Sequence, residues 1–265
     1  MNAENSDPAP THAASSGLEL LFVLTGVLLL ALLPVASGWL HYLAGGCSLI
    51  FLLTAVLSRG AMAVHVLLLT AACYLWIQVW PSKLPFFLLG PLLIYGAAVW
   101  AVPFLRRSAG WLRMGVLDRP VLWLVGLTVV VSSAALVLWF LFAKPDVSQW
   151  VAAVPKVSMT ALVAVGFGFA VLNAIVEESI YRGIVMHAVE RSLGPGLRSI
   201  ILQMVPFGLI HLDGIPSGWV GVGLAMIYGL MLGWVRLRSR GMLAPIVAHI
   251  FTDIVIFSML VLVVR

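Results

Sequence analysis

Six ionisable side chains stand within apolar sequence in the last third of this chain. They are Glu177, Glu178, Arg182, His211, His249 and Asp253. A charged side chain at bilayer depth costs roughly 2.5 to 3.5 kcal/mol on insertion scales, so such groups usually face the interior of a helix bundle and take part in function. Carboxyl and imidazole groups take up and return protons, so this set predicts acid–base chemistry.

Helical spacing indicates which of these groups pair. Glu178 and Arg182 stand at i and i+4, on one face of a helix, which predicts a buried ion pair. Glu177 is turned away from the arginine by about 140°. Burial without a nearby cation favours the uncharged form of a carboxyl group, which can then exchange a proton near neutral pH. Glu177 is therefore the predicted general base, and a purely structural contact between two helices is the alternative.

Two histidines can join this glutamate. The Gly194-Pro195-Gly196 sequence predicts a break between two antiparallel helices. Glu177 and His211 each stand 17 residues from Gly194, so we expect them at one depth on neighbouring helices, suited to hold a water molecule. His249 and Asp253 share a helix face at i and i+4, so Asp253 can orient the imidazole or face a cavity. A helix-packing hydrogen bond is the alternative for this last pair.

Helices across a membrane must position these residues. The 265-residue chain is 62% hydrophobic and 9% charged, against about 25% charged in ordinary globular domains, which excludes a water-soluble fold. The alternating pattern of a membrane barrel is absent. Most of the nine apolar runs approach the ~20 residues that a spanning helix needs. The runs are Leu18–Val35, Trp39–Leu57, Met62–Val79, Phe86–Leu105, Val121–Phe142, Val157–Val176, Ser199–Ile210, Val220–Val235 and Met242–Val264. We expect an all-α, polytopic transmembrane helical bundle of about eight to nine spanning helices.

The chain divides into three predicted parts. Residues 1–17 are polar and proline-containing, which predicts a disordered tail. Residues 18–156 form N-terminal transmembrane helices, in which we expect His65 to be a packed helix histidine. Within this part, the arginine-rich segment 106–119 is either an interfacial helix on anionic lipid or a solvated basic loop. Residues 157–265 form the predicted catalytic core.

The net charge of +5 indicates membrane topology rather than nucleic-acid binding. Most arginines stand in short loops beside the apolar runs, as the positive-inside rule expects of cytoplasmic loops. The loop that carries Lys144 and Lys156 then lies outside. We expect a multi-pass protein of a bacterial inner (plasma) membrane, with the active site in the cytoplasmic half of the bilayer.

Three motifs follow one another on late spans. They are Glu-Glu-x-x-x-Arg at 177–182, Phe-x-x-x-His at 207–211 and His-x-x-x-Asp at 249–253. In this order they resemble the CPBP family of intramembrane proteases, which includes the type II CAAX prenyl endopeptidases and bacterial proteins linked to bacteriocin processing and self-immunity. The resemblance covers roughly Val157 to Phe257 and not the first half of the chain.

The resemblance implies a glutamic-type peptide hydrolase. Glu177 would activate water with help from His211, while His249 and Asp253 would stabilise the oxyanion. Members of the family also carry Asn at the last position. Because an ionised aspartate repels an oxyanion, we expect Asp253 to be protonated or to orient His249. The implied substrate is a membrane-anchored protein or peptide, with no nucleic acid as partner. The residues do not specify a lipidated substrate, and they do not specify the oligomeric state.

Three other functions are alternatives to this one. Two glutamates and two histidines could bind zinc, and the family has been described as metal-dependent, but the chain has no His-Glu-x-x-His run. We expect no cofactor, with zinc as the alternative. A transporter should show repeated halves with polar groups in each, which the one-sided distribution disfavours. A non-catalytic immunity protein should have lost one of Glu177, His211 and His249, and none is replaced.

Overall fold

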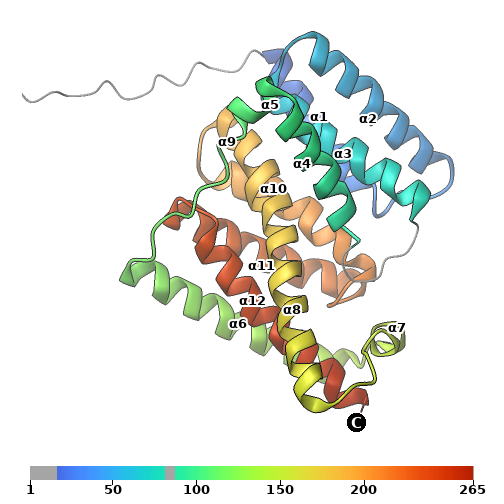
Figure 1. Ribbon diagram of the computed structural model, residues 1–265, viewed down its shortest axis with the longest axis vertical. Helices are drawn as coiled ribbons and strands as arrows, with labels where there is room; N and C mark the ends of the chain where they lie inside the picture. Colours follow the sequence, from blue (N-terminus) through green and yellow to red (C-terminus); the bar gives the residue numbers. More distant parts are fainter. Residues whose placement is uncertain (1–16, 81–86, 265) are drawn as a thin grey trace, which may run out of the picture.

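The computed structural model describes residues 17–80 and 87–264, and over these ranges the chain is helical with no strand. This confirms the all-α prediction (Figure 1). The predicted tail lies outside the described residues, apart from Gly17, which begins the first helix.

The helices before the catalytic core come first. They are α1 (Gly17–Leu32), α2 (Trp39–Leu57), α3 (Ala61–Val79), α4 (Leu89–Ala101), α5 (Pro103–Ser108), α6 (Arg119–Ala143) and α7 (Ser148–Ala152). The remaining elements are α8 (Met159–Glu178), η1 (Ser179–Val185), α9 (Met186–Leu193), α10 (Leu197–Leu209), η2 (Ile210–Asp213), α11 (Gly218–Ser239) and α12 (Leu243–Val264).

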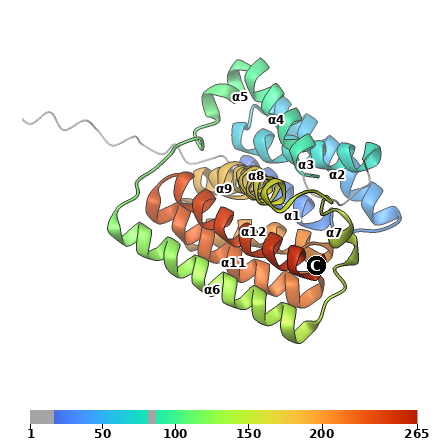
Figure 2. The same cartoon turned by 60° about the horizontal axis from the view of Figure 1, so that its bottom comes forward.

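The helices pack in three layers (Figures 1 and 2). Helices α1 to α5 form one outer layer, and α8 to α10 form the middle. Helices α11 and α12 pack on the other side of the middle layer, and α6 covers them. The main apolar core joins the first two layers, since it contains Val23 and Leu67 together with Ile180 and Phe207. The first two motifs therefore lie in the middle layer or directly after it, and the third lies on α12, between α8 and α6.

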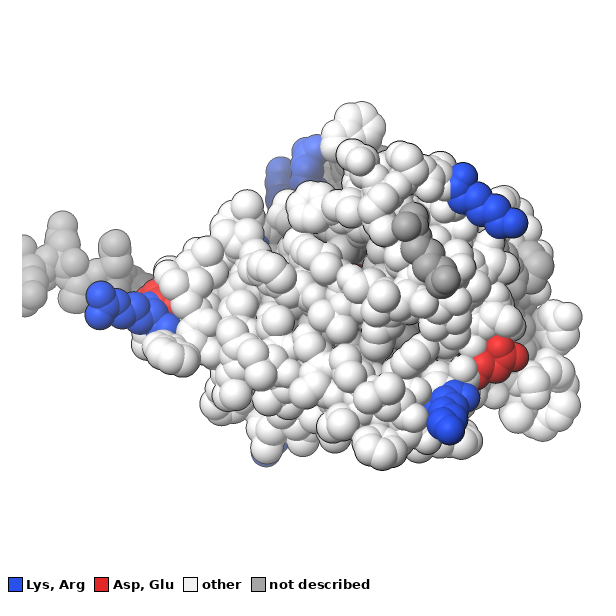
Figure 3. Space-filling view, turned by 90° about the horizontal axis from the view of Figure 1, so that it is seen from below, with Lys and Arg blue, Asp and Glu red and all other residues white. Residues whose placement is uncertain are grey.

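The outer surface is apolar, as a lipid-facing surface must be. Trp123, Phe142 and Leu262 are exposed to 80%, 81% and 78%. Seen from below, the described surface carries charged side chains at only a few places, mostly near its edge (Figure 3). These features support an integral membrane protein.

Six helical segments are long and apolar enough to cross a membrane. They are Trp39–Leu57, Ala61–Val79, Arg119–Ala143, Met159–Leu193, Gly218–Ser239 and Leu243–Val264. Helices α1, α4 and α10 have 16, 13 and 13 residues, or about 20 to 24 Å at 1.5 Å per residue, against a hydrocarbon core of about 30 Å. The described helices therefore support a multi-pass bundle but do not confirm the count of eight to nine spans.

The middle layer is built on one long helix. The Ser158 side chain accepts a hydrogen bond from the Ala161 N–H at 3.3 Å and caps the start of α8. The helix continues through η1, a stretch of π-helix, to the end of α9, where Gly194 takes a positive φ of 82°. Such wider turns often occur at functional sites. The predicted break at Gly194 is confirmed.

The arginine-rich segment 106–119 is helical only in α5 and in the first residue of α6. Between them the chain runs without helix across the turn that joins α11 to α12. The Val116 N–H donates to the Ser239 carbonyl at 2.9 Å, and the Met242 N–H donates to the Arg113 carbonyl at 2.7 Å. This segment therefore ties α6 to the turn that precedes the last helix.

Candidate active site

The predicted ion pair is present in the middle layer. Arg182 Nη1 donates to Glu178 Oε1 at 2.9 Å, and neither side chain is exposed. The guanidinium carbon also lies 4.1 Å from the centre of the Phe207 ring, a favourable cation–π geometry. A buried charge pair needs such additional partners to offset its loss of hydration.

A carbonyl of α11 supplies further partners. The Gly229 carbonyl accepts from Arg182 Nη2 at 3.4 Å and from Gln203 Nε2 at 2.7 Å. A Cβ atom at position 229 would lie only 2.9 Å from the Phe207 ring. Glycine at this position therefore lets α11 approach α10 closely enough for this carbonyl to reach both donors.

The same glutamate holds the last histidine. His249 Nδ1 lies 2.7 Å from Glu178 Oε1 and donates its hydrogen there. His249 Nε2 lies 3.7 Å from Glu177 Oε2 and 3.6 Å from Asp253 Oδ1. Both separations exceed a hydrogen bond. Glu178, on the facing helix, therefore fixes the orientation of the ring, whereas the sequence spacing offered Asp253 for this part.

Glu177 differs from its neighbour as predicted. Its side chain is 15% exposed, whereas that of Glu178 is fully buried. Within residues 17–80 and 87–264, Glu177 Oε2 has no hydrogen-bond partner. One oxygen of this carboxyl group is therefore free to accept a proton from a bound water molecule.

His211 lies in η2, directly after α10. Its Nδ1 donates to the Phe207 carbonyl at 2.8 Å, so the hydrogen sits on Nδ1 and the lone pair on Nε2. The Phe207 ring separates the two histidines, with ring centroids 4.9 Å from His211 and 6.2 Å from His249. His211 can therefore accept a hydrogen bond from a water molecule.

A cavity of about 610 Å³ joins these groups. Its wall includes the four predicted catalytic residues, Glu177, His211, His249 and Asp253. Most of the remaining wall is apolar and comes from both outer layers as well as from the middle one. The cavity extends to Trp150, in the short α7 helix. Glu178 and Arg182 do not line this wall, but Glu178 contacts His249 in it.

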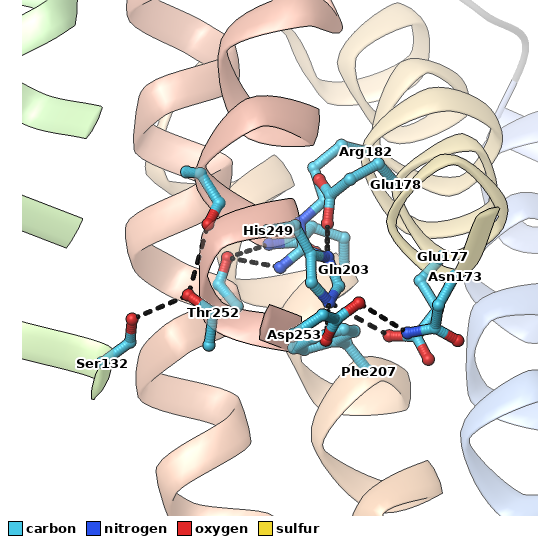
Figure 4. A network of polar contacts seen from close by, with 12 residues as sticks. Ser132, Asn173, Glu177, Glu178, Arg182, Gln203, Phe207, His249, Thr252 and Asp253 are labelled. Carbon is cyan, nitrogen blue, oxygen red and sulfur yellow. Dashed lines mark hydrogen bonds and ion pairs between the residues drawn. The ribbon is translucent and has the colours of Figure 1, made fainter. Parts of the chain in front are cut away.

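Sequence reasoning missed three polar residues around this wall. Asn173 Nδ2 donates to Asp253 Oδ2 at 3.1 Å, bridging α8 and α12 (Figure 4). Gln203 bonds the Gly229 carbonyl, and the Tyr228 ring packs edge-on against His249 with centroids 5.5 Å apart. Asn173 had a usable signal, since it is a polar residue one helical turn before Glu177 in an apolar run. Tyr228 had none.

The comparison with protein families agrees with this geometry. Residues 158–255 match the family model described as type II CAAX prenyl endopeptidase Rce1-like. This segment belongs to the CPBP family of intramembrane proteases. The Rce1-like segment runs from the cap of α8 into α12 and contains all three motifs. No match was found among curated proteins or among solved structures.

The Rce1-like segment contains carboxyl and imidazole groups of the kinds that bind metal ions. Among the described residues, no three His, Cys, Asp or Glu side chains are grouped to hold a metal ion. One reason is that Glu178 Oε1 already binds Arg182 and His249. The side chains as they stand do not fit a zinc site.

Proposed function

We propose that this protein is an intramembrane endopeptidase that hydrolyses a peptide bond of a membrane-anchored protein or peptide. One observation carries the proposal, namely that a carboxyl group with a free oxygen and two oriented imidazoles line a single cavity. The family of the Rce1-like segment is a protease family. Both point to hydrolysis rather than to transport.

In this proposal Glu177 and His211 activate the water. The water donates one hydrogen bond to Glu177 Oε2 and one to His211 Nε2. As its oxygen attacks the carbonyl carbon, the proton passes to Glu177 and the carbonyl electron pair moves onto the oxygen. When the C–N bond breaks, Glu177 returns the proton to the departing nitrogen. The products are a carboxylic acid and an amine, and Glu177 is restored.

His249 and Asp253 act on the other side of the carbonyl. His249 presents Nε2 to the cavity because Glu178 binds its Nδ1. In the imidazolium form, which the surrounding carboxyl groups of Glu177, Glu178 and Asp253 favour, Nε2 also carries a hydrogen and can donate it to the oxyanion. Asp253 orients its neighbours rather than meeting the oxyanion itself. Donors that await the developing charge are worth about 10²- to 10³-fold in rate each.

The cavity and the helix ends fit a substrate that is itself in the membrane. His249 stands six residues into α12, or about 9 Å from its start, so the reaction takes place inside the bundle, near its arginine-rich end. We assign this end to the cytoplasmic side of a bacterial plasma membrane, by the positive-inside rule. The apolar wall would bind the side chains that flank the cleaved bond.

A comparison of membrane proteomes tests the proposal. Cells with the wild-type protein should contain a polypeptide with a new terminus, and cells with Glu177→Gln should retain the longer form. Glu190→Gln is the matched control, because Glu190 is also largely buried but faces Arg236 at 3.7 Å. The control should cleave the substrate as wild type does, because Glu190 does not line the cavity. A truncated product at full level in the Glu177→Gln cells would overturn the proposal.

Purified protein separates the metal-independent mechanism from a zinc-dependent one. After washing with a chelator that removes zinc, the wild-type enzyme should cleave the identified substrate at its original rate. Activity that disappears on chelation and returns with zinc alone would instead establish a metal-dependent peptidase.

A further inference from the structure

Asn173 is a polar side chain that the catalytic steps above leave unused. It lies on α8, one helical turn before Glu177, and both side chains line the cavity. Its Nδ2 donates to Asp253 Oδ2 at 3.1 Å (Figure 4). Asn173 is partly buried and Asp253 is 3% exposed. The amide is therefore held by a buried carboxyl group directly beside the proposed base.

The amide of Asn173 can donate a hydrogen bond into the part of the cavity beside Asp253. Asp253 accepts a hydrogen bond from Asn173 through Oδ2, and in its ionised form it has no hydrogen to donate to an oxyanion. An amide nitrogen carries two hydrogens, and the contact with Asp253 uses one of them. The other hydrogen faces the Glu177 carboxyl group, beside which the attacked carbonyl would lie.

We propose that Asn173 is a catalytic residue that donates a hydrogen bond to the oxyanion, and that Asp253 positions its amide for this step. The inference rests on the proposed peptidase function. No bond to Asn173 forms or breaks: as water attacks, the carbonyl electron pair moves to oxygen, and the N–H of Asn173 stabilises that charge together with His249. The amide donor therefore comes from Asn173 on α8. The carboxyl group of Asp253 on α12 only accepts.

This arrangement predicts a compensation between two helices. If Asn173 is the donor, Asn173→Ala should lower kcat about 100-fold while KM changes less than about threefold, because the donor acts mainly in the transition state. In the double variant Asn173→Ala with Asp253→Asn, the new amide at 253 can donate instead. We expect kcat to recover to within about tenfold of wild type.

The test uses full-length protein in vesicles with the cleaved substrate. Asp253→Asn alone is the reference for the double variant, and Glu190→Gln, which lies outside the cavity wall, is the control that should keep kcat within about threefold of wild type. If Asn173→Ala fails to insert, Asn173→Asp replaces it, since that side chain has nearly the same volume, and Asp253→Asn is again added to restore an amide. Thermal unfolding of each variant shows whether a lost contact alone accounts for a lower rate.

Two results would overturn the inference. One is a kcat of the donor-less variant within about threefold of wild type. The other is a double variant as slow as the single one, which would show that Asn173 only bridges α8 and α12. In either case an inactive Glu177→Gln enzyme leaves the proposed function standing. An active Glu177→Gln enzyme removes that function whatever the position-173 variants do.

Discussion

The two halves of the molecule both bury polar side chains, but they use them differently. In the N-terminal half, the Trp111 N–H donates to the Tyr95 hydroxyl at 3.3 Å, and that hydroxyl donates to His65 Nδ1 at 2.7 Å. His65 Nε2 donates to Ser108 Oγ at 2.9 Å, and Ser108 donates to the Leu105 carbonyl at 3.0 Å. Each group of this chain has a partner, and none needs a charge.

The C-terminal half instead contains buried charged side chains, and some of their polar atoms have no hydrogen-bond partner among the described residues. Glu178 holds both Arg182 and His249, while Glu177 Oε2 lacks a partner among the described residues and faces the cavity. A buried charge is costly and an unbonded buried oxygen adds to the cost. The comparison teaches that burial of polar groups alone does not mark a site. A charge network with an unbonded carboxyl oxygen on a cavity wall does.

The largest stability effect should come from breaking the charge network. Arg182→Gln leaves Glu178 as a buried charge without its cation, which should lower the free energy of unfolding by about 3 to 5 kcal/mol and also release His249 from its place. Thermal unfolding in detergent measures the change. A variant as stable as wild type would show that the ion pair does not hold the helices together.

Removal of His211, the second group that binds the catalytic water, should lower the cleavage rate and leave the free energy of unfolding nearly unchanged. His211→Ala takes away the Nε2 lone pair, and kcat should fall about 100-fold. Because His211 lies in η2 beyond the end of α10, the unfolding temperature should move little. Initial rates on the identified substrate check this. A rate within threefold of wild type would remove His211 from the mechanism.

The neutral network should show the opposite behaviour. His65→Phe removes the acceptor of the Tyr95 hydroxyl and the donor to Ser108 Oγ, which costs about 1 to 3 kcal/mol. The remaining folded enzyme should cleave at the wild-type rate, because the described cavity wall does not include this network. Loss of activity without loss of stability would mean that both halves take part in the chemistry.

The smallest effect is expected at the surface. Arg238 and Asp118 lie 3.7 Å apart, with 49% and 45% of their side chains exposed. Exposed pairs contribute roughly 0 to 1 kcal/mol, so Arg238→Gln should change neither unfolding nor cleavage measurably. A loss of more than about 2 kcal/mol would show that the contact between the 106–119 segment and the last hairpin depends on this pair.

Local patterns in the sequence predicted the parts of this molecule that depend on neighbours along the chain. The i, i+4 spacing of Glu178 and Arg182 fixes their pairing on any helix. The glycines around Pro195 end one helix and begin the next. His65 is a packed helix histidine, as expected. The wider turn of η1 has no such local signature, so it was not foreseen.

Contacts between distant helices could not be read in the same way. The hydrogen bond from His249 to Glu178 depends on how α12 packs against α8. The spacing of residues along the sequence does not indicate which helices pack together. The bond from Asn173 to Asp253 depends on the same packing. The sequence therefore predicted which residues line the site, whereas their hydrogen-bond partners on other helices could be identified only from the structure.

The most direct measurement is the cleavage rate of purified Glu177→Gln enzyme, with its unfolding temperature matched against wild type and against Glu190→Gln. The substitution keeps the size of the side chain and removes its ability to take up the proton of water. The account predicts a folded enzyme with no measurable cleavage, while the Glu190→Gln enzyme cleaves normally. Cleavage by Glu177→Gln at the wild-type rate would contradict the account.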